Sequence, residues 1–110
     1  MSQTIAIILK FRESEAGRFE EIFEAEILPL WHRFLADGKF IGASLTPIEG
    51  GDPRPEGERH YILHVEVPGM AEHEEFDEHP TFLEFLPRAK ALQPKPPNVW
   101  FGNTRFKVGG

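Results

Sequence analysis

The sequence contains no cysteine among its 110 residues. The chain therefore has no disulfide bond, no thiolate nucleophile and no cysteine-ligated metal site. This absence is compatible with the reducing cytoplasm, where disulfide bonds are rare. Residues 1–4 run directly into the apolar residues 5–9, without the basic segment and small-residue cleavage site of a secretory signal. We therefore expect a cytoplasmic protein.

The sequence also lacks long apolar runs and an excess of positive charge. No apolar run approaches the ~20 residues that a membrane-spanning helix needs. Twelve Lys and Arg residues stand against eighteen Asp and Glu residues, which gives a formal net charge of -6. Nucleic acids and anionic lipids attract proteins largely through neutralised phosphates, so this charge opposes both kinds of binding. We expect neither a membrane nor a nucleic acid as a partner.

What the sequence has in abundance is phenylalanine. A chain of 110 residues has the usual size of one domain, and we take residues 1–110 as a single domain. A domain of this size buries roughly two-thirds of the surface that its unfolded chain exposes, which suffices for a core. Ten Phe residues are many for this length and predict a core rich in aromatic side chains.

Four segments have the period-two apolar pattern of β-strands. In residues 5–12 one face is wholly apolar, and the other face becomes basic toward its end. Residues 40–47, 60–67 and 98–108 predict the other three strands. In the last of these, the alternation places Trp100 on one face and Phe101 with Asn103 on the other. Residues 48–59, rich in Gly and Pro, predict a long loop.

Two regions have helical periodicity. Apolar residues recur at three- and four-residue steps over residues 16–37, with Ser14 as the expected N-cap and Gly38 following the C-terminus. Pro29 predicts a kink in this helix. Residues 70–78 predict an acidic helical turn or two. A second helix is expected to begin at Pro80, with His79 as its cap and Pro87 limiting or bending it.

The order of elements predicts the fold. Strand, helix, strand, strand, helix, strand is the split βαβ pattern of ferredoxin-like folds. We therefore predict an α+β domain in which a four-stranded antiparallel sheet carries two helices on one face.

A local motif adds to this order. Residues 76–86 hold an aromatic residue, an acidic stretch, a His-Pro pair and an aromatic-rich helix, and residues 99–101 read Val99-Trp100-Phe101. With these features the chain resembles the dimeric α/β-barrel superfamily, in particular its antibiotic-biosynthesis-monooxygenase-like and stress-responsive barrel branches. The resemblance implies a homodimer whose two sheets close into a barrel. It also implies chemistry without a cofactor, because the superfamily includes cofactor-free oxygenases and isomerases.

The superfamily also contains haem-degrading proteins, but this sequence departs from them. Those proteins use an Asn, a Trp and a His in fixed places. The first strand predicted here has no Asn, and the third has Tyr61 in place of Trp. Only His79 lies in the helical region where their His is found. Haem degradation is therefore not expected.

The candidate functional residues lie on one face of the predicted sheet. By alternation, the face away from the helices carries polar and charged side chains, namely Lys10, Arg12, His60, His64, Glu66, Asn103, Arg105 and Lys107. These residues either form ion pairs across a dimer interface or line a pocket for an anionic or quinone-like ligand. In the second case we expect Lys10, Arg12, His60 and Arg105 to bind the ligand.

His64, assisted by Glu66, is the candidate general acid or base. Histidine titrates near neutral pH and can serve in either role. Lys10 and Arg12 are expected beside it on the neighbouring strand. His79 is the second catalytic candidate, because it matches the helix position of the family. His60 and His64 are about 13 Å apart along one strand, too far to share a metal ion, and we expect no metal site.

Two functions follow from these observations. The first is a small-molecule-binding barrel protein that acts as a cofactor-independent monooxygenase or isomerase on an aromatic or quinone-like substrate. The alternative is a non-catalytic interaction or stress-associated protein whose polar sheet face serves only dimerisation. A homodimer through the sheet faces is expected in both, because Ile8, Ile62 and Phe101 are predicted on the uncovered face.

Overall fold

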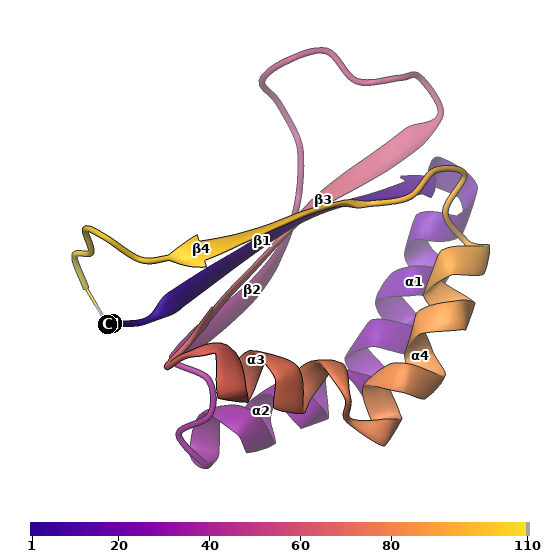
Figure 1. The fold of residues 1–110 in the computed structure, drawn as a ribbon. Coiled ribbons are helices and arrows are strands. Elements are labelled where there is room, and N and C mark those ends of the chain that lie inside the picture. The colour runs from indigo at the N-terminus through magenta and orange to yellow at the C-terminus, as the bar shows by residue number, and fades with distance from the viewer. Residues whose placement is uncertain (110) are drawn as a thin grey trace.

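The computed structural model describes residues 1–109. Its elements follow in the order β1 (Gln3–Arg12), α1 (Glu13–Glu26), α2 (Leu28–Ala36), β2 (Gly42–Pro47), β3 (Glu58–Val67), α3 (Met70–Asp77), α4 (Pro80–Ala91) and β4 (Asn98–Asn103). The strands form one sheet in the order β2-β3-β1-β4, and every pairing is antiparallel. All helices lie on the same side of this sheet (Figure 1). The predicted ferredoxin-like α+β fold is confirmed.

Each of the two predicted helical regions is divided into two helices. α1 ends at Glu26 and α2 begins at Leu28, so that Pro29 lies in the first turn of α2, where its missing N–H costs nothing. The second region divides at His79, between α3 and α4. Figure 1 shows the resulting bend between α1 and α2 and between α3 and α4. Pro87, by contrast, lies inside α4 and does not end it.

Two predicted helix ends can be compared with the structure. Gly38 has a positive φ of 72° directly after the C-cap residue of α2, as expected for the residue that ends a helix. The prediction that Ser14 caps α1 is wrong. β1 continues into α1 without a loop, so that Arg12 takes the N-cap position and Ser14 lies inside the helix.

The last strand is shorter than predicted and turned to the opposite face. β4 ends at Asn103, and the chain then leaves the sheet, with the Thr104 N–H donating to the Ser2 carbonyl at 2.8 Å. Phe101 pairs with Ile5, and paired residues of antiparallel strands share a face, so Phe101 faces the helices. The expectation that Phe101 and Asn103 lie on the uncovered face is therefore wrong. Trp100, paired with Ala6, lies there instead.

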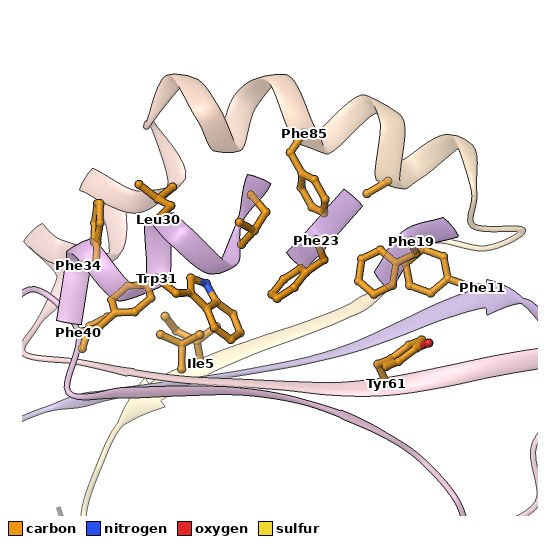
Figure 2. Packing of buried hydrophobic residues seen from close by; sticks show 14 of the residues in the cluster. Ile5, Phe11, Phe19, Phe23, Leu30, Trp31, Phe34, Phe40, Tyr61 and Phe85 are labelled. Carbon is orange, nitrogen blue, oxygen red and sulfur yellow. The ribbon is translucent and has the colours of Figure 1, made fainter. Parts of the chain in front are cut away.

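The core is aromatic, as predicted. Phe11 and Phe19 are fully buried and stack with their ring centroids 4.0 Å apart, and Tyr61 meets both rings edge-on. Figure 2 shows these rings between the sheet and the helices, with Phe23 and Phe85 further along the same layer. The interlocking rings fix the distance between β1 and α1. No helix among residues 1–109 is long and apolar enough to cross a membrane.

Replacing Phe19 by Ala should strongly destabilise the fold. The side chain is 1% exposed and contacts Phe11, Phe23, Tyr61 and Phe85, so its removal leaves a cavity among rings that cannot collapse together. We expect Phe19→Ala to lower the free energy of unfolding by about 3–5 kcal/mol in urea titrations. Phe106→Ala is the matched control, because Phe106 is 88% exposed. Equal stability of the two variants would contradict this description of the core.

Candidate functional site

A cavity of about 380 Å³ lies between the helix-facing side of the sheet and the helices. Ligand sites of small molecules have volumes of roughly 300–1,000 Å³ and are mostly apolar with a few polar groups. The walls here are almost entirely aliphatic and aromatic side chains, including Ile7, Leu9, Leu63, Trp31 and Phe82. The cavity is therefore suited to an apolar, aromatic molecule.

The shape of the helix layer explains why this space is not filled. The breaks between α1 and α2 and between α3 and α4 make the helices arch over the middle of the sheet (Figure 1). Ile7, Leu9 and Leu63 occupy that middle region and remain only partly buried, although they face the helices. Phe11 and Val67 at the ends of their strands are, in contrast, completely buried.

Few polar side chains reach the cavity, and two of them form a pair on α3. His73 and Asp77 are separated by four residues and therefore lie on the same face of the helix. The His73 Nε2 atom is 3.2 Å from Asp77 Oδ2, and both residues line the cavity. His73 is buried, with 11% of its side chain exposed, whereas the Asp77 side chain is 53% exposed. The pair thus connects the cavity with the protein surface.

The other imidazole nitrogen of His73 contacts the sheet. His73 Nδ1 lies 2.6 Å from Gln3 Oε1, and Gln3 Nε2 donates to Met70 Sδ at 3.6 Å. The contact with sulfur assigns the amide so that its oxygen faces the imidazole. His73 Nδ1 therefore donates its proton to Gln3, and Nε2 is the nitrogen turned toward Asp77.

Asp77 has an unusual electrostatic setting. Partial burial raises the pKa of its carboxyl group above the ordinary value, His73 lowers it, and the neighbouring Glu78 and Glu74 carboxylates raise it further. The net effect is a raised pKa. A partly buried carboxyl group with a raised pKa, beside an imidazole in a cavity, is a candidate group for accepting a proton.

The far end of the cavity carries Lys90 and Gln93. Gln93 Oε1 accepts a hydrogen bond of 3.2 Å from the backbone N–H of Lys10, near the end of β1. Gln3, the partner of His73, stands at the start of the same strand, seven positions earlier and about 23 Å away. The two polar ends of the cavity therefore lie over opposite ends of β1.

The predicted catalytic residues His64 and Glu66 do not line the cavity. His64 is exposed on the uncovered sheet face, opposite Ala6 and Ser44. Glu66 accepts hydrogen bonds from Ser2 Oγ at 2.6 Å and from Lys107 Nζ at 2.9 Å, and both lower the pKa of its carboxyl group, Ser2 the more strongly. The role of His64 and Glu66 in catalysis stays a prediction.

The residues predicted to bind a ligand are dispersed as well. Lys10 pairs across the strands with His60, and Arg12 pairs with Glu58. The expectation that these two cations lie beside His64 is therefore wrong. His60 is buried and bonds through Nε2 to Glu58 Oε1 at 2.9 Å. The Glu58 pKa is lowered by this bond and then by Lys95, whose Nζ is 3.0 Å from Glu58 Oε2. None of these residues lines the cavity.

Arg105 and His79 also lie away from the cavity wall. Arg105 follows the end of β4, so the expectation that it lies on the sheet face is wrong. Its guanidinium lies 5.6 Å from the centroid of the Phe106 ring. His79 caps α4, with Nδ1 accepting from the Thr81 N–H at 3.2 Å, which confirms its interpretation as a helix cap. A catalytic role of His79 stays a prediction. Within residues 1–109, no three His, Asp or Glu side chains lie close enough together to hold a metal ion.

Sequence reasoning missed His73, Asp77 and Gln3. The four-residue spacing of His73 and Asp77 on a helix was a signal for the pair. The contact with Gln3 joins residues 70 positions apart, and only the packing of α3 against β1 creates it.

The comparisons with known proteins concern the fold. No family model matches the sequence, and no curated protein matches it. Among solved structures, Rv0793 from Mycobacterium tuberculosis has a TM-score of 0.75 at 16% identity, covering 99% of this chain and 100% of that chain. A Caulobacter crescentus CB15 protein, provisionally assigned as an antibiotic biosynthesis monooxygenase, has a TM-score of 0.73 at 16% identity. The match covers 96% of this chain and 91% of that chain.

SnoaB, a cofactor-independent oxygenase from Streptomyces nogalater, has a TM-score of 0.69 at 14% identity and covers 99% of this chain and 98% of that chain. The chain thus has the fold of structures described as antibiotic biosynthesis monooxygenases, as the sequence motif around residues 76–86 indicated.

Filling the cavity should remove its capacity for an aromatic molecule. We expect the wild-type protein to bind 1-naphthol, measured by fluorescence titration, and Leu63→Trp to bind it at least ~10-fold more weakly because the indole occupies the space. Leu83→Trp is the control, because Leu83 is 51% exposed on α4 and does not line the cavity. Equal affinities of the two variants would show that the probe binds elsewhere.

Proposed function

We propose that this protein is a cofactor-independent monooxygenase that oxidises a hydroxylated aromatic substrate inside the cavity. The observation that supports the proposal is the cavity itself, which has aromatic walls and one acid–base pair. The fold shared with SnoaB, a cofactor-independent oxygenase, adds to this support. Fold alone does not determine function, whereas the residues that line the cavity determine which molecules it can bind.

The chemistry of such a substrate fits what the site offers. A hydroxylated aromatic ring that loses its hydroxyl proton becomes an electron-rich phenolate, which can itself reduce dioxygen. In the overall reaction, the ring C–H and the O–H bonds break, one oxygen atom becomes a new carbonyl of a quinone, and the other leaves as water. The substrate supplies all the electrons. The protein has to hold the ring, exclude water and accept the proton.

The apolar walls perform the first two tasks. Trp31 and Phe23 meet edge-on with their centroids 4.9 Å apart, and Phe76 and Phe82 approach to 4.8 Å. Flat aromatic surfaces of this kind contact the face and the edge of a bound ring. The exclusion of water strengthens electrostatic interactions within the cavity.

We further propose that two copies of the chain associate through the uncovered sheet face. Ile62 and Trp100 are 42% and 60% exposed there, and Ile8 lies between them on β1. Burying such apolar surface stabilises an assembly by about 25 cal/mol per Å². The two carboxylates of this face are paired within the chain, Glu66 with Lys107 and Glu58 with His60 and Lys95. This pairing favours a role of the face in association, while the cavity on the other side binds the ligand.

Oxygen uptake tests the proposed reaction. A panel of naphthols and dihydroxynaphthalenes, assayed with an oxygen electrode, should contain compounds that consume one O₂ per quinone formed. With ¹⁸O₂, one labelled atom should appear in the quinone. Leu83→Trp should retain this activity and Leu63→Trp should lose most of it, because Leu63 lines the cavity and Leu83 does not. Binding without oxygen uptake across the panel would refute an oxygenase and leave an isomerase or a binding protein.

Sedimentation tests the proposed dimer. We expect the wild-type protein to sediment at twice the mass of 12.6 kDa at micromolar concentration. Trp100→Glu should shift it to the monomer, because a two-fold interface would bury two unpaired carboxylates at a cost of several kcal/mol. Leu83→Glu, on the helix side, should remain dimeric. A wild-type monomer would rule out the proposed assembly.

A further inference from the structure

We propose that His73 and Asp77 together accept the hydroxyl proton of the substrate, and that Gln3 holds His73 in the tautomer that makes this transfer possible. The inference rests on the proposed function, because it assigns the proton acceptor of the same cavity. It concerns residues that were not among the candidates predicted from the sequence.

The contact with Gln3 determines the tautomer of His73. Gln3 Oε1 has no proton to give, and it lies 2.6 Å from His73 Nδ1. Nδ1 must therefore carry a proton, whether the imidazole is neutral or charged. In the neutral imidazole, the lone pair then belongs to Nε2, which faces Asp77 Oδ2 at 3.2 Å. Gln3 thus determines which nitrogen is available to the carboxylate.

A neutral imidazole and an ionised carboxylate place two acceptors opposite each other, at a distance that one shared proton would bridge. The pair in this state has a charge of -1 and takes up one proton. That proton comes from the substrate O–H bond, whose electron pair stays on the oxygen. The product of the step is a phenolate beside a neutral, proton-bridged pair.

Both residues of the pair line the cavity, and His73 is buried, with neighbours on β1 and β4. Phe101 of β4 meets the imidazole edge-on at 5.2 Å between ring centroids, and Gln3 of β1 lies on the Nδ1 side. The substrate therefore meets the pair from the cavity, while the exposed part of Asp77 releases the proton to water afterwards.

The surrounding charges favour proton uptake by the pair. The groups that act on Asp77 are His73 itself and the carboxylates of Glu74 and Glu78, from α3 and its C-cap. β1 contributes the uncharged Gln3 and β4 the uncharged Phe101. The two neighbouring carboxylates thus stabilise the protonated form of the pair. Its apparent pKa belongs to the pair as a whole.

The experiment measures proton transfer separately from oxygenation. 1-Naphthol changes its absorbance when its hydroxyl ionises, so a pH titration of the bound probe under anaerobic conditions reports the transfer directly. In the wild-type protein, bound naphtholate should appear at a lower pH than in Asp77→Asn, by about one pH unit or more, a tenfold change in the ionisation equilibrium. His73→Gln should behave like Asp77→Asn. Both variants should bind the neutral probe with an affinity close to that of the wild type.

Aerobic turnover gives the second readout. kcat of Asp77→Asn and His73→Gln should fall by ~10²–10⁴-fold, the usual effect of losing a general base, and should rise at high pH where the substrate ionises unaided. The controls are Asp52→Asn and His32→Gln, matched substitutions at residues outside the cavity. Gln3→Ala should shift the pH dependence of kcat and should lower kcat less than Asp77→Asn and His73→Gln do. Gln3→Glu, which retains an acceptor for His73 Nδ1, should restore the pH dependence of the wild type.

The outcomes separate the two proposals. If the wild-type protein ionises bound naphthol at lower pH than the variants but takes up no oxygen with any substrate, the proposed oxygenase is wrong and the proton acceptor stands. If all variants bind and ionise the probe as the wild type does, or turn over within about threefold of it, the assignment of His73 and Asp77 is wrong. If Gln3→Glu behaves like Gln3→Ala, the role assigned to Gln3 is wrong.

Discussion

The pairing of β1 with both of its neighbours determines most of this structure. β1 is paired over ten positions with β3 and over six with β4, which makes it the central strand on which the layers are built. Its alternation places Ile5 and Phe11 under the helices and Ile8 on the uncovered face. A shift of one residue would exchange the two faces, and the buried aromatic side chains prevent such a shift. The same strand provides the partners of two residues that line the cavity, Gln3 for His73 and the backbone N–H of Lys10 for Gln93.

The cavity exists because the helix layer is bent and the sheet below it is not completely covered. Two long straight helices would pack close to the sheet along their whole length. The breaks at Ile27 and His79 produce four shorter helices instead, and a row of aromatic rings lies between these helices and the sheet (Figure 2). Phe11 and Phe19 close one end, while Phe34 and Phe40 meet edge-on at the other. Between these ends, Phe23, Trp31 and Phe85 form part of the cavity wall.

The polar groups of the protein fall into two sets with different roles. Those beside the uncovered face, such as Glu66 and Glu58, have partners within the chain that lower the pKa of their carboxyl groups and keep them charged. Those at the cavity, His73 and Asp77, share one contact in which both partners can accept a proton. A paired charge resists titration, whereas an acceptor facing another acceptor gains stability by taking up a proton. This difference explains why the acid–base chemistry is assigned to the helix side of the sheet.

The sequence by itself determined the order of elements, the covered face of β1 and β3, the turn at Gly38 and the cap at His79. These features depend on local periodicity and backbone preference, which neighbouring residues specify. Only the tertiary structure decided the face of β4, because Trp100 and Phe101 are both aromatic and alternation cannot choose between them. It also decided the site. His73 and Gln3 are 70 positions apart in the sequence but in direct contact in the fold. The cavity that His73 lines is enclosed by several elements together, a property that no single segment of the sequence encodes.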